Sequence, residues 1–159
     1  MIRLTMLTAM LILCSTARAA ATTQAAILTA VQSSGSISKT LTLDFIELYR
    51  DSPTDIARAI RARRVVSQQE FWLKAPGGLM TFNTNPQLRK LKTTPRTTYE
   101  LQCLNTQQSI RPLRVSEATF FRAWQGSTTC WPLEVANRMV VELTVEGAAI
   151  VKITQVYLP

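Results

Sequence analysis

Histidine is absent from this chain of 159 residues, and its absence limits the chemistry that the side chains could perform. Without histidine there is no Ser-His-Asp or Cys-His catalytic group and no zinc site of the HExxH type. The three cysteines alone cannot supply the four ligands of a structural zinc site. We therefore expect no enzymatic activity, no metal and no cofactor, which leaves binding as the default function.

Carboxylates could still hydrolyse glycosides without histidine, because that reaction needs only two of them. Four lie close together in the sequence: Asp44, Glu47, Asp51 and Asp55. Two of the four fit the start of a helix and one fits the polar face of a strand, so a carboxylate hydrolase is kept only as a second alternative. Ser36 and Lys39 match the SxxK spacing of Ser-Lys enzymes, but they lie in an alternating strand pattern, which indicates a chance match.

Two basic clusters are the candidate residues for an anionic partner. The first is expected on one helix and consists of Arg58, Arg61, Arg63 and Arg64. Guanidinium groups can bind phosphate or carboxylate groups bidentately. The second contains Arg89, Lys90 and Lys92, with Arg96 further along, and is expected over 83–98 in a polar surface loop or in a hairpin with a broken strand. Simple solvation of both clusters is the competing interpretation. The second cluster lacks the interleaved aromatic residues typical of single-stranded nucleic-acid binding.

Residues 1–19 have the pattern of an export signal. A short basic start precedes an apolar run over 4–14, and Ala17 and Ala19 stand at the −3 and −1 positions of a cleavage site. Cleavage would remove Arg3 and Arg18, so the expected net charge falls from +8 to +6. A lipoprotein that carries its lipid on Cys14 is disfavoured by the bulky preceding residue. We therefore expect the protein in the periplasm or outside the cell.

Export would leave two cysteines, Cys103 and Cys130, which lie 27 residues apart. An even pair in an oxidising compartment predicts a disulfide, with free buried thiols as the alternative. A loop of this size would contribute about 3–4 kcal/mol to stability.

The elements that must position these residues alternate between strands and capped helices. Strand patterns cover 37–45, 70–74, 79–83, 98–104 and 110–115, and a closing hairpin covers 139–157. Helices are expected over about 53–66, with Ser52 as N-cap, and over 116–125. The predicted fold is α+β: an antiparallel sheet of several short strands with one well-capped helix (about 53–66) and one or two shorter helices. The domains would be a signal peptide (1–19), a flexible N-terminal arm (20–36) and a single disulfide-linked α+β domain (37–159).

These features predict a non-enzymatic exported binding or accessory subunit that docks to another envelope or secreted protein or to an anionic envelope surface. The unpaired edge of a sheet offers one docking mode, and the N-terminal arm and the C-terminal strand are the expected edges. The alternative is a secreted β-rich subunit that recognises a carbohydrate or another cell-surface ligand, including as an oligomer. Export argues against a nucleic-acid partner.

Overall fold

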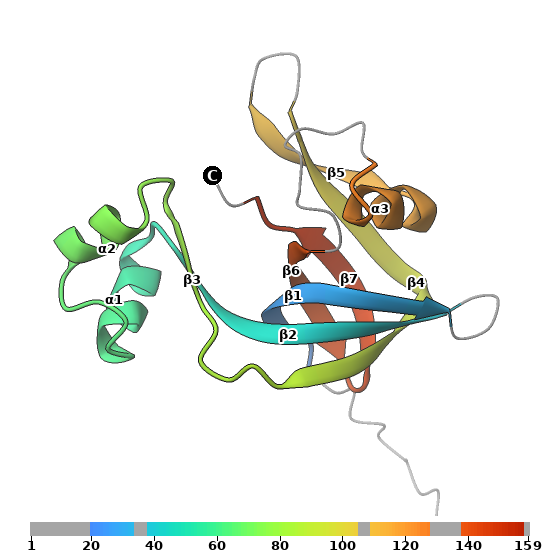
Figure 1. The fold of residues 1–159 in the computed structure, drawn as a ribbon, viewed down its shortest axis with the longest axis horizontal. Helices are drawn as coiled ribbons and strands as arrows, with labels where there is room; N and C mark the ends of the chain where they lie inside the picture. Colours follow the sequence, from blue (N-terminus) through green and yellow to red (C-terminus); the bar gives the residue numbers. More distant parts are fainter. Residues whose placement is uncertain (1–19, 34–37, 105–108, 128–137, 158–159) are drawn as a thin grey trace, which may run out of the picture.

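A computed structural model describes residues 20–33, 38–104, 109–127 and 138–157, and Figure 1 shows its ribbon. The expected export signal, residues 1–19, lies outside the described residues. The described part contains seven strands and three helices: β1 (Thr22–Ser33), β2 (Lys39–Arg50), α1 (Pro53–Arg61), α2 (Gln68–Lys74), β3 (Leu79–Phe82), β4 (Leu88–Leu104), β5 (Ile110–Val115), α3 (Glu117–Trp124), β6 (Met139–Glu146) and β7 (Ala149–Gln155). None of the helices in these ranges is long and apolar enough to cross a membrane.

Five strands close into a barrel in the order β1-β2-β4-β7-β6 and back to β1. Four of the five pairings are antiparallel, and the pairing of β4 with β7 is parallel. The barrel closes because β4 is 17 residues long and reaches both neighbours, with a register shift between Thr93 and Thr98. The predicted α+β fold with an antiparallel sheet is therefore wrong, since the structure is mostly β with a closed barrel. Five-stranded Greek-key barrels are the architecture of OB folds, which serve many functions, so the barrel alone assigns none.

Alternate side chains of the strands fill the interior of the barrel. The fully buried ones include Leu28, Leu41, Leu43, Leu101, Met139, Val141, Leu143, Ile150 and Ile153. Helix α3 packs on this core through Phe120, Phe121 and Trp124, and all three are buried. The indole N–H of Trp124 donates to the carbonyl oxygen of Leu28 at 3.1 Å, which fastens α3 to β1. Trp124 is thus part of the core, whereas Trp72 is half exposed and Trp131 lies outside the described residues.

The segment between β2 and β4 forms a helical module of α1, α2 and β3 (residues 53–82). Figure 1 shows α1 and α2 at one end of the molecule, away from the barrel strands. β3 pairs with the last four residues of β2, so the module continues the sheet. It has an apolar core of its own, formed by Tyr49, Ile56, Ala59, Val65, Phe71, Ala75 and Met80.

Helix α2 replaces the strand that the sequence predicted over 70–74. Ser67 is its N-cap, and the Ser67 hydroxyl accepts a hydrogen bond from the Glu70 backbone N–H at 3.1 Å. The Glu70 carboxylate accepts in turn from the backbone N–H of Val66 at 2.6 Å, one residue before the N–H that a capping box would use. Helix α1 begins at Pro53 after the predicted Ser52 cap but ends at Arg61, because Arg63 takes a left-handed φ of 57°.

Removal of the Ser67 cap should weaken α2. Ser67→Ala leaves the Glu70 backbone N–H without its partner, so we expect a loss of about 1 kcal/mol in the free energy of unfolding. Urea unfolding followed by far-UV circular dichroism measures this loss. Ser33→Ala, at the exposed end of β1, is the matched control, and an equal loss in the two variants would show that Ser67 does not act as a cap.

Three further expectations differ from the structure. Residues 20–36 do not form a flexible arm where described, because β1 pairs with β2 on one side and β6 on the other. The C-terminal strand β7 is also paired on both sides, so neither expected docking edge is free. The polar stretch over 83–98 becomes a strand from Leu88 onward, since its residues pair with β2.

The predicted disulfide between Cys103 and Cys130 is not found within the part of the chain that the structure describes. Cys103 lies half-buried on β4. Cys130 lies outside the described residues, so the structure does not support the description of the domain as disulfide-linked.

Candidate anion-binding site

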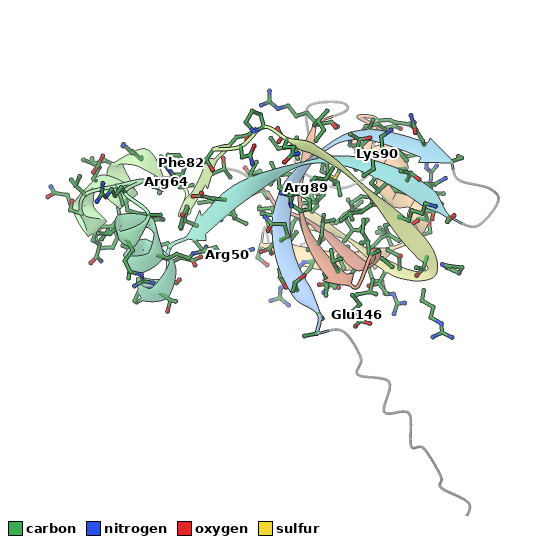
Figure 2. All side chains as sticks on the ribbon, turned by 90° about the horizontal axis from the view of Figure 1, so that it is seen from below. Arg50, Arg64, Phe82, Arg89, Lys90 and Glu146 are labelled. Carbon is green, nitrogen blue, oxygen red and sulfur yellow. The ribbon has the colours of Figure 1, made fainter. Side chains whose placement is uncertain are left out.

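The first basic cluster splits into two arginines whose side chains have polar partners within the chain, Arg58 and Arg64, and two whose side chains have none in its described part, Arg61 and Arg63. Arg64 donates to both carboxylate oxygens of Glu47, at 2.8 and 2.7 Å, and its guanidinium lies 5.7 Å from the ring centroid of Phe82. Figure 2 shows Arg64 and Phe82 next to each other within the module. Arg58 donates to the carbonyl oxygen of Leu48 at 2.5 Å and pairs with Asp55 at 3.0 Å. These two guanidinium groups already have partners within the chain and hold the module on β2.

The Arg64 pair also changes the acidity of its partner. Hydrogen bonds from Arg64 are the main cause that lowers the pKa of Glu47 from its usual 4.5 to about 2. Burial, followed by the hydrogen bond to Glu47, raises the pKa of Tyr49. Glu47 therefore stays charged at any pH at which the protein is expected to work, and it acts as an anchor for Arg64.

Glu47→Gln should destabilise the protein at neutral pH and not in acid. A carboxylate whose pKa is lowered on folding stabilises the folded state above its unfolded pKa of about 4.5, and this contribution is lost as the pH falls towards 2. We expect a loss of about 1 kcal/mol at pH 7, because the pair is partly exposed. Urea unfolding at pH 7 and at pH 2.5 checks this, and an equal difference at both pH values would contradict it.

Arg61 and Arg63 remain exposed on the module, and neither has a carboxylate partner within the described residues. They lie in the last turn of α1 and just after it. The structure therefore divides the predicted helix face and leaves only these two arginines for an external anion.

The second basic cluster lies on the first half of β4, where Arg89, Lys90 and Lys92 are all exposed. Lys90 and Lys92 are opposite Thr42 and Thr40 in the register, on the outer face of the barrel. None of the three cations has a hydrogen bond or ion pair with another side chain in the described ranges. Figure 2 labels Arg89 and Lys90 on β4 alongside β2.

Arg89 points to the other side of β4, because it is opposite the buried Leu43 in the register. Its guanidinium lies 4.7 Å from the ring centroid of Phe45, which positions it by a cation–π contact. The pair borders a cavity of about 310 Å³ at the end of the barrel where β1 begins and β6 ends; we call it the mouth cavity. Its lining is Thr22, Thr23, Gln24, Phe45, Arg89, Leu91 and Val145.

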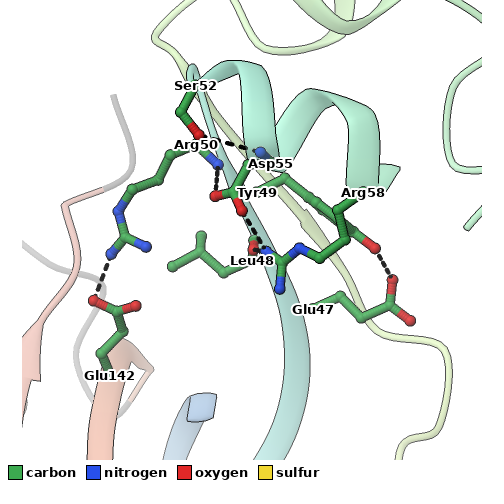
Figure 3. A network of polar contacts seen from close by, with 8 residues as sticks. All are labelled: Glu47, Leu48, Tyr49, Arg50, Ser52, Asp55, Arg58 and Glu142. Atoms are coloured by element: carbon green, nitrogen blue, oxygen red, sulfur yellow. Dashed lines mark hydrogen bonds and ion pairs between the residues drawn. The ribbon is translucent and has the colours of Figure 1, made fainter. Parts of the chain in front are cut away.

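A second cavity, of about 380 Å³, lies between the barrel and the module, and its charged lining residues are paired within the chain. Arg50 forms an ion pair with Glu142, as Figure 3 shows. The Arg50 backbone N–H donates to Asp55 at 2.8 Å, and Arg58 also faces this cavity. Because these charged groups are paired within the chain, we assign them to holding the module in place.

The candidate catalytic carboxylates are each engaged by a separate partner. Asp44 accepts a hydrogen bond from Asn83 at 2.6 Å, and Asp51 accepts from the indole N–H of Trp72 at 3.0 Å. Within the described ranges, no group of three cysteine or acidic side chains could hold a metal ion. Ser36 of the SxxK match lies outside those ranges.

The strongest site is thus the first half of β4, where Arg89 borders the partly apolar mouth cavity and Lys90 and Lys92 lie on the outer face of the same strand. The sequence pointed to the cations but not to Phe45 or the start of β1, because both are brought to Arg89 only by barrel closure. Comparison with protein-family models, curated proteins and solved structures gives no match to this chain.

Proposed function

We propose that this chain is an exported, non-enzymatic binding subunit that docks onto an anionic glycan of the cell envelope. The β4 cluster of Arg89, Lys90 and Lys92 would make the contact. The observation that carries the proposal is that these three cations lie together on one strand and have no hydrogen-bonding or ionic partner in the described part of the chain. Export is supported by the signal pattern of residues 1–19.

The spacing of the cluster suits a polymer with repeated negative charges. Lys90 and Lys92 lie about 7 Å apart along the outer face of β4, since residues two apart share a face. The neighbouring Thr40 and Thr42 of β2 bring hydroxyl groups to the same face. Arg89 adds a planar guanidinium at the mouth cavity, which fits a carboxylate, sulfate or phosphate group.

An anionic surface is favoured over strand addition at the expected edges, because both of those strands are paired on two sides inside the barrel. The excess of basic residues also favours an anionic partner, since a net positive charge attracts anionic polymers to the surface of the protein. Catalysis is not proposed, because the candidate carboxylates hold structural partners.

The ligand class can be tested with a pair of polysaccharides that differ only in charge. Dextran sulfate should bind the purified protein, and the affinity should fall as salt rises from 50 to 500 mM because the contacts are exposed charges. Neutral dextran of the same length should not bind. Equal binding of both would contradict the proposal, as would a clear preference for single-stranded DNA at the same charge density.

A further inference from the structure

The helical module presents three large apolar side chains to solvent at α2. Val66 is 86 % exposed, Leu73 is 76 % exposed and Trp72 is 48 % exposed. All three lie on α2 or directly before it, and we call them the apolar tip. Exposed apolar side chains are ordinary when isolated, whereas three of them within residues 66–73 make this segment a candidate interaction surface.

The apolar tip is not required by the packing of the module. Val65 is 2 % exposed and Phe71 is fully buried, so the neighbours of the tip residues in the sequence already fill the core. The chain could place polar residues at the exposed positions without loss of burial. A role outside the molecule therefore accounts for Val66 and Leu73 better than folding does.

Short contacts hold the apolar tip in a fixed arrangement. The Glu70 carboxylate accepts a hydrogen bond from the Val66 backbone N–H at 2.6 Å. The same carboxylate forms an ion pair with Lys74 at 2.6 Å. Leu73 lies about one helical turn after Glu70 on the same helix. The Trp72 indole N–H donates to Asp51 at 3.0 Å, which leaves part of the ring in solvent. The tip is thus organised before it meets a partner.

Free positive charges accompany the apolar tip. Arg61 and Arg63 end α1 a few residues before Val66, and both are exposed with no carboxylate partner in the described part of the chain. Apolar side chains beside unpaired cations match an anionic membrane surface. The apolar side chains enter the membrane interface, and the cations contact the phosphate groups of the lipids. Tryptophan with a polar N–H also suits this boundary.

We propose that the apolar tip inserts into the interface of an anionic lipid membrane and thereby places the barrel at the membrane surface. The module projects at one end of the molecule, so the tip can reach a flat surface without interference from the barrel (Figure 1). The proposal concerns a different face from the glycan site and does not depend on it. The protein would lie on the membrane rather than span it.

The experiment uses sedimentation with vesicles of phosphatidylglycerol and, separately, phosphatidylcholine. The protein should bind the anionic vesicles, and Val66→Ser/Leu73→Ser should weaken that binding at least about tenfold, because each aliphatic side chain that enters the interface contributes strongly. The tryptophan emission should shift to the blue on binding, and Trp72→Phe should remove the shift. Arg61→Gln/Arg63→Gln should weaken binding at low salt and have less effect at high salt.

Two controls separate this proposal from its alternatives. Leu113→Ser removes a 54 % exposed leucine from β5 and should leave vesicle binding unchanged. Arg89→Gln/Lys90→Gln/Lys92→Gln should keep the emission shift even though the glycan site is lost. Unchanged vesicle binding by the Val66→Ser/Leu73→Ser variant would overturn the proposal. Sedimentation of the protein without vesicles would also overturn it, because it would indicate contact between copies of the chain.

Discussion

Phe120→Ala should lower the free energy of unfolding by about 3–5 kcal/mol, because it removes a fully buried aromatic ring from the barrel core. The ring centroid of Phe120 lies 5.4 Å from that of Tyr99 on β4 and 5.6 Å from that of Phe121. These contacts join α3 to the barrel wall. The resulting cavity cannot collapse easily, since the surrounding strands are fixed by closure of the barrel.

Urea unfolding of the wild-type protein and of the Phe120→Ala variant measures this loss. Arg122→Ala, on the exposed side of the same helix, is the control and should cost less than about 0.5 kcal/mol. If Phe120→Ala cost no more than the control, α3 would not be part of the barrel core.

The second large effect concerns the proposed glycan site. Arg89→Gln/Lys90→Gln/Lys92→Gln should weaken binding to dextran sulfate at least about tenfold, since three exposed charge contacts together contribute somewhat more than 1.4 kcal/mol. Stability should change little, because the three side chains are exposed. Isothermal titration calorimetry at 50 mM salt provides the affinities.

A charge-matched control separates local contact from general attraction. Arg96→Gln/Arg111→Gln/Arg114→Gln removes the same charge from exposed positions on β4 and β5 and should change the affinity less than twofold. If the two triple variants weakened binding to dextran sulfate equally, the affinity would depend only on the net charge. The site could then not be assigned to the first half of β4.

Local signals in the sequence predicted part of the fold. Ser52 and Ser116 begin helices as expected, because an N-cap is a contact within four residues. Ser67 and Glu70 also have the spacing of a helix start, but Phe71, Trp72 and Leu73 after them resemble a strand. Barrel closure was not predictable in this way, since it depends on Leu88–Lys92 of β4 pairing with β2, more than 40 residues earlier.

The candidate site shows the same limit. The sequence offered Arg64 and Arg89 alike as candidates for an anionic partner, yet Arg64 is bound by Glu47 on β2, 17 residues away in the sequence. Arg89 instead stacks on Phe45 and makes no hydrogen bond or ion pair with another side chain in the described part of the chain. Only the tertiary arrangement separates an arginine with a structural role from one that can bind.

Chemical-shift mapping can show directly whether an anionic polymer contacts the first half of β4. A ¹⁵N-labelled sample titrated with a short sulfated dextran should show its largest amide shifts at Arg89, Lys90 and Lys92, with smaller ones at Phe45. Shifts centred on Arg111 and Arg114 of β5, with none at Arg89, would contradict such a contact.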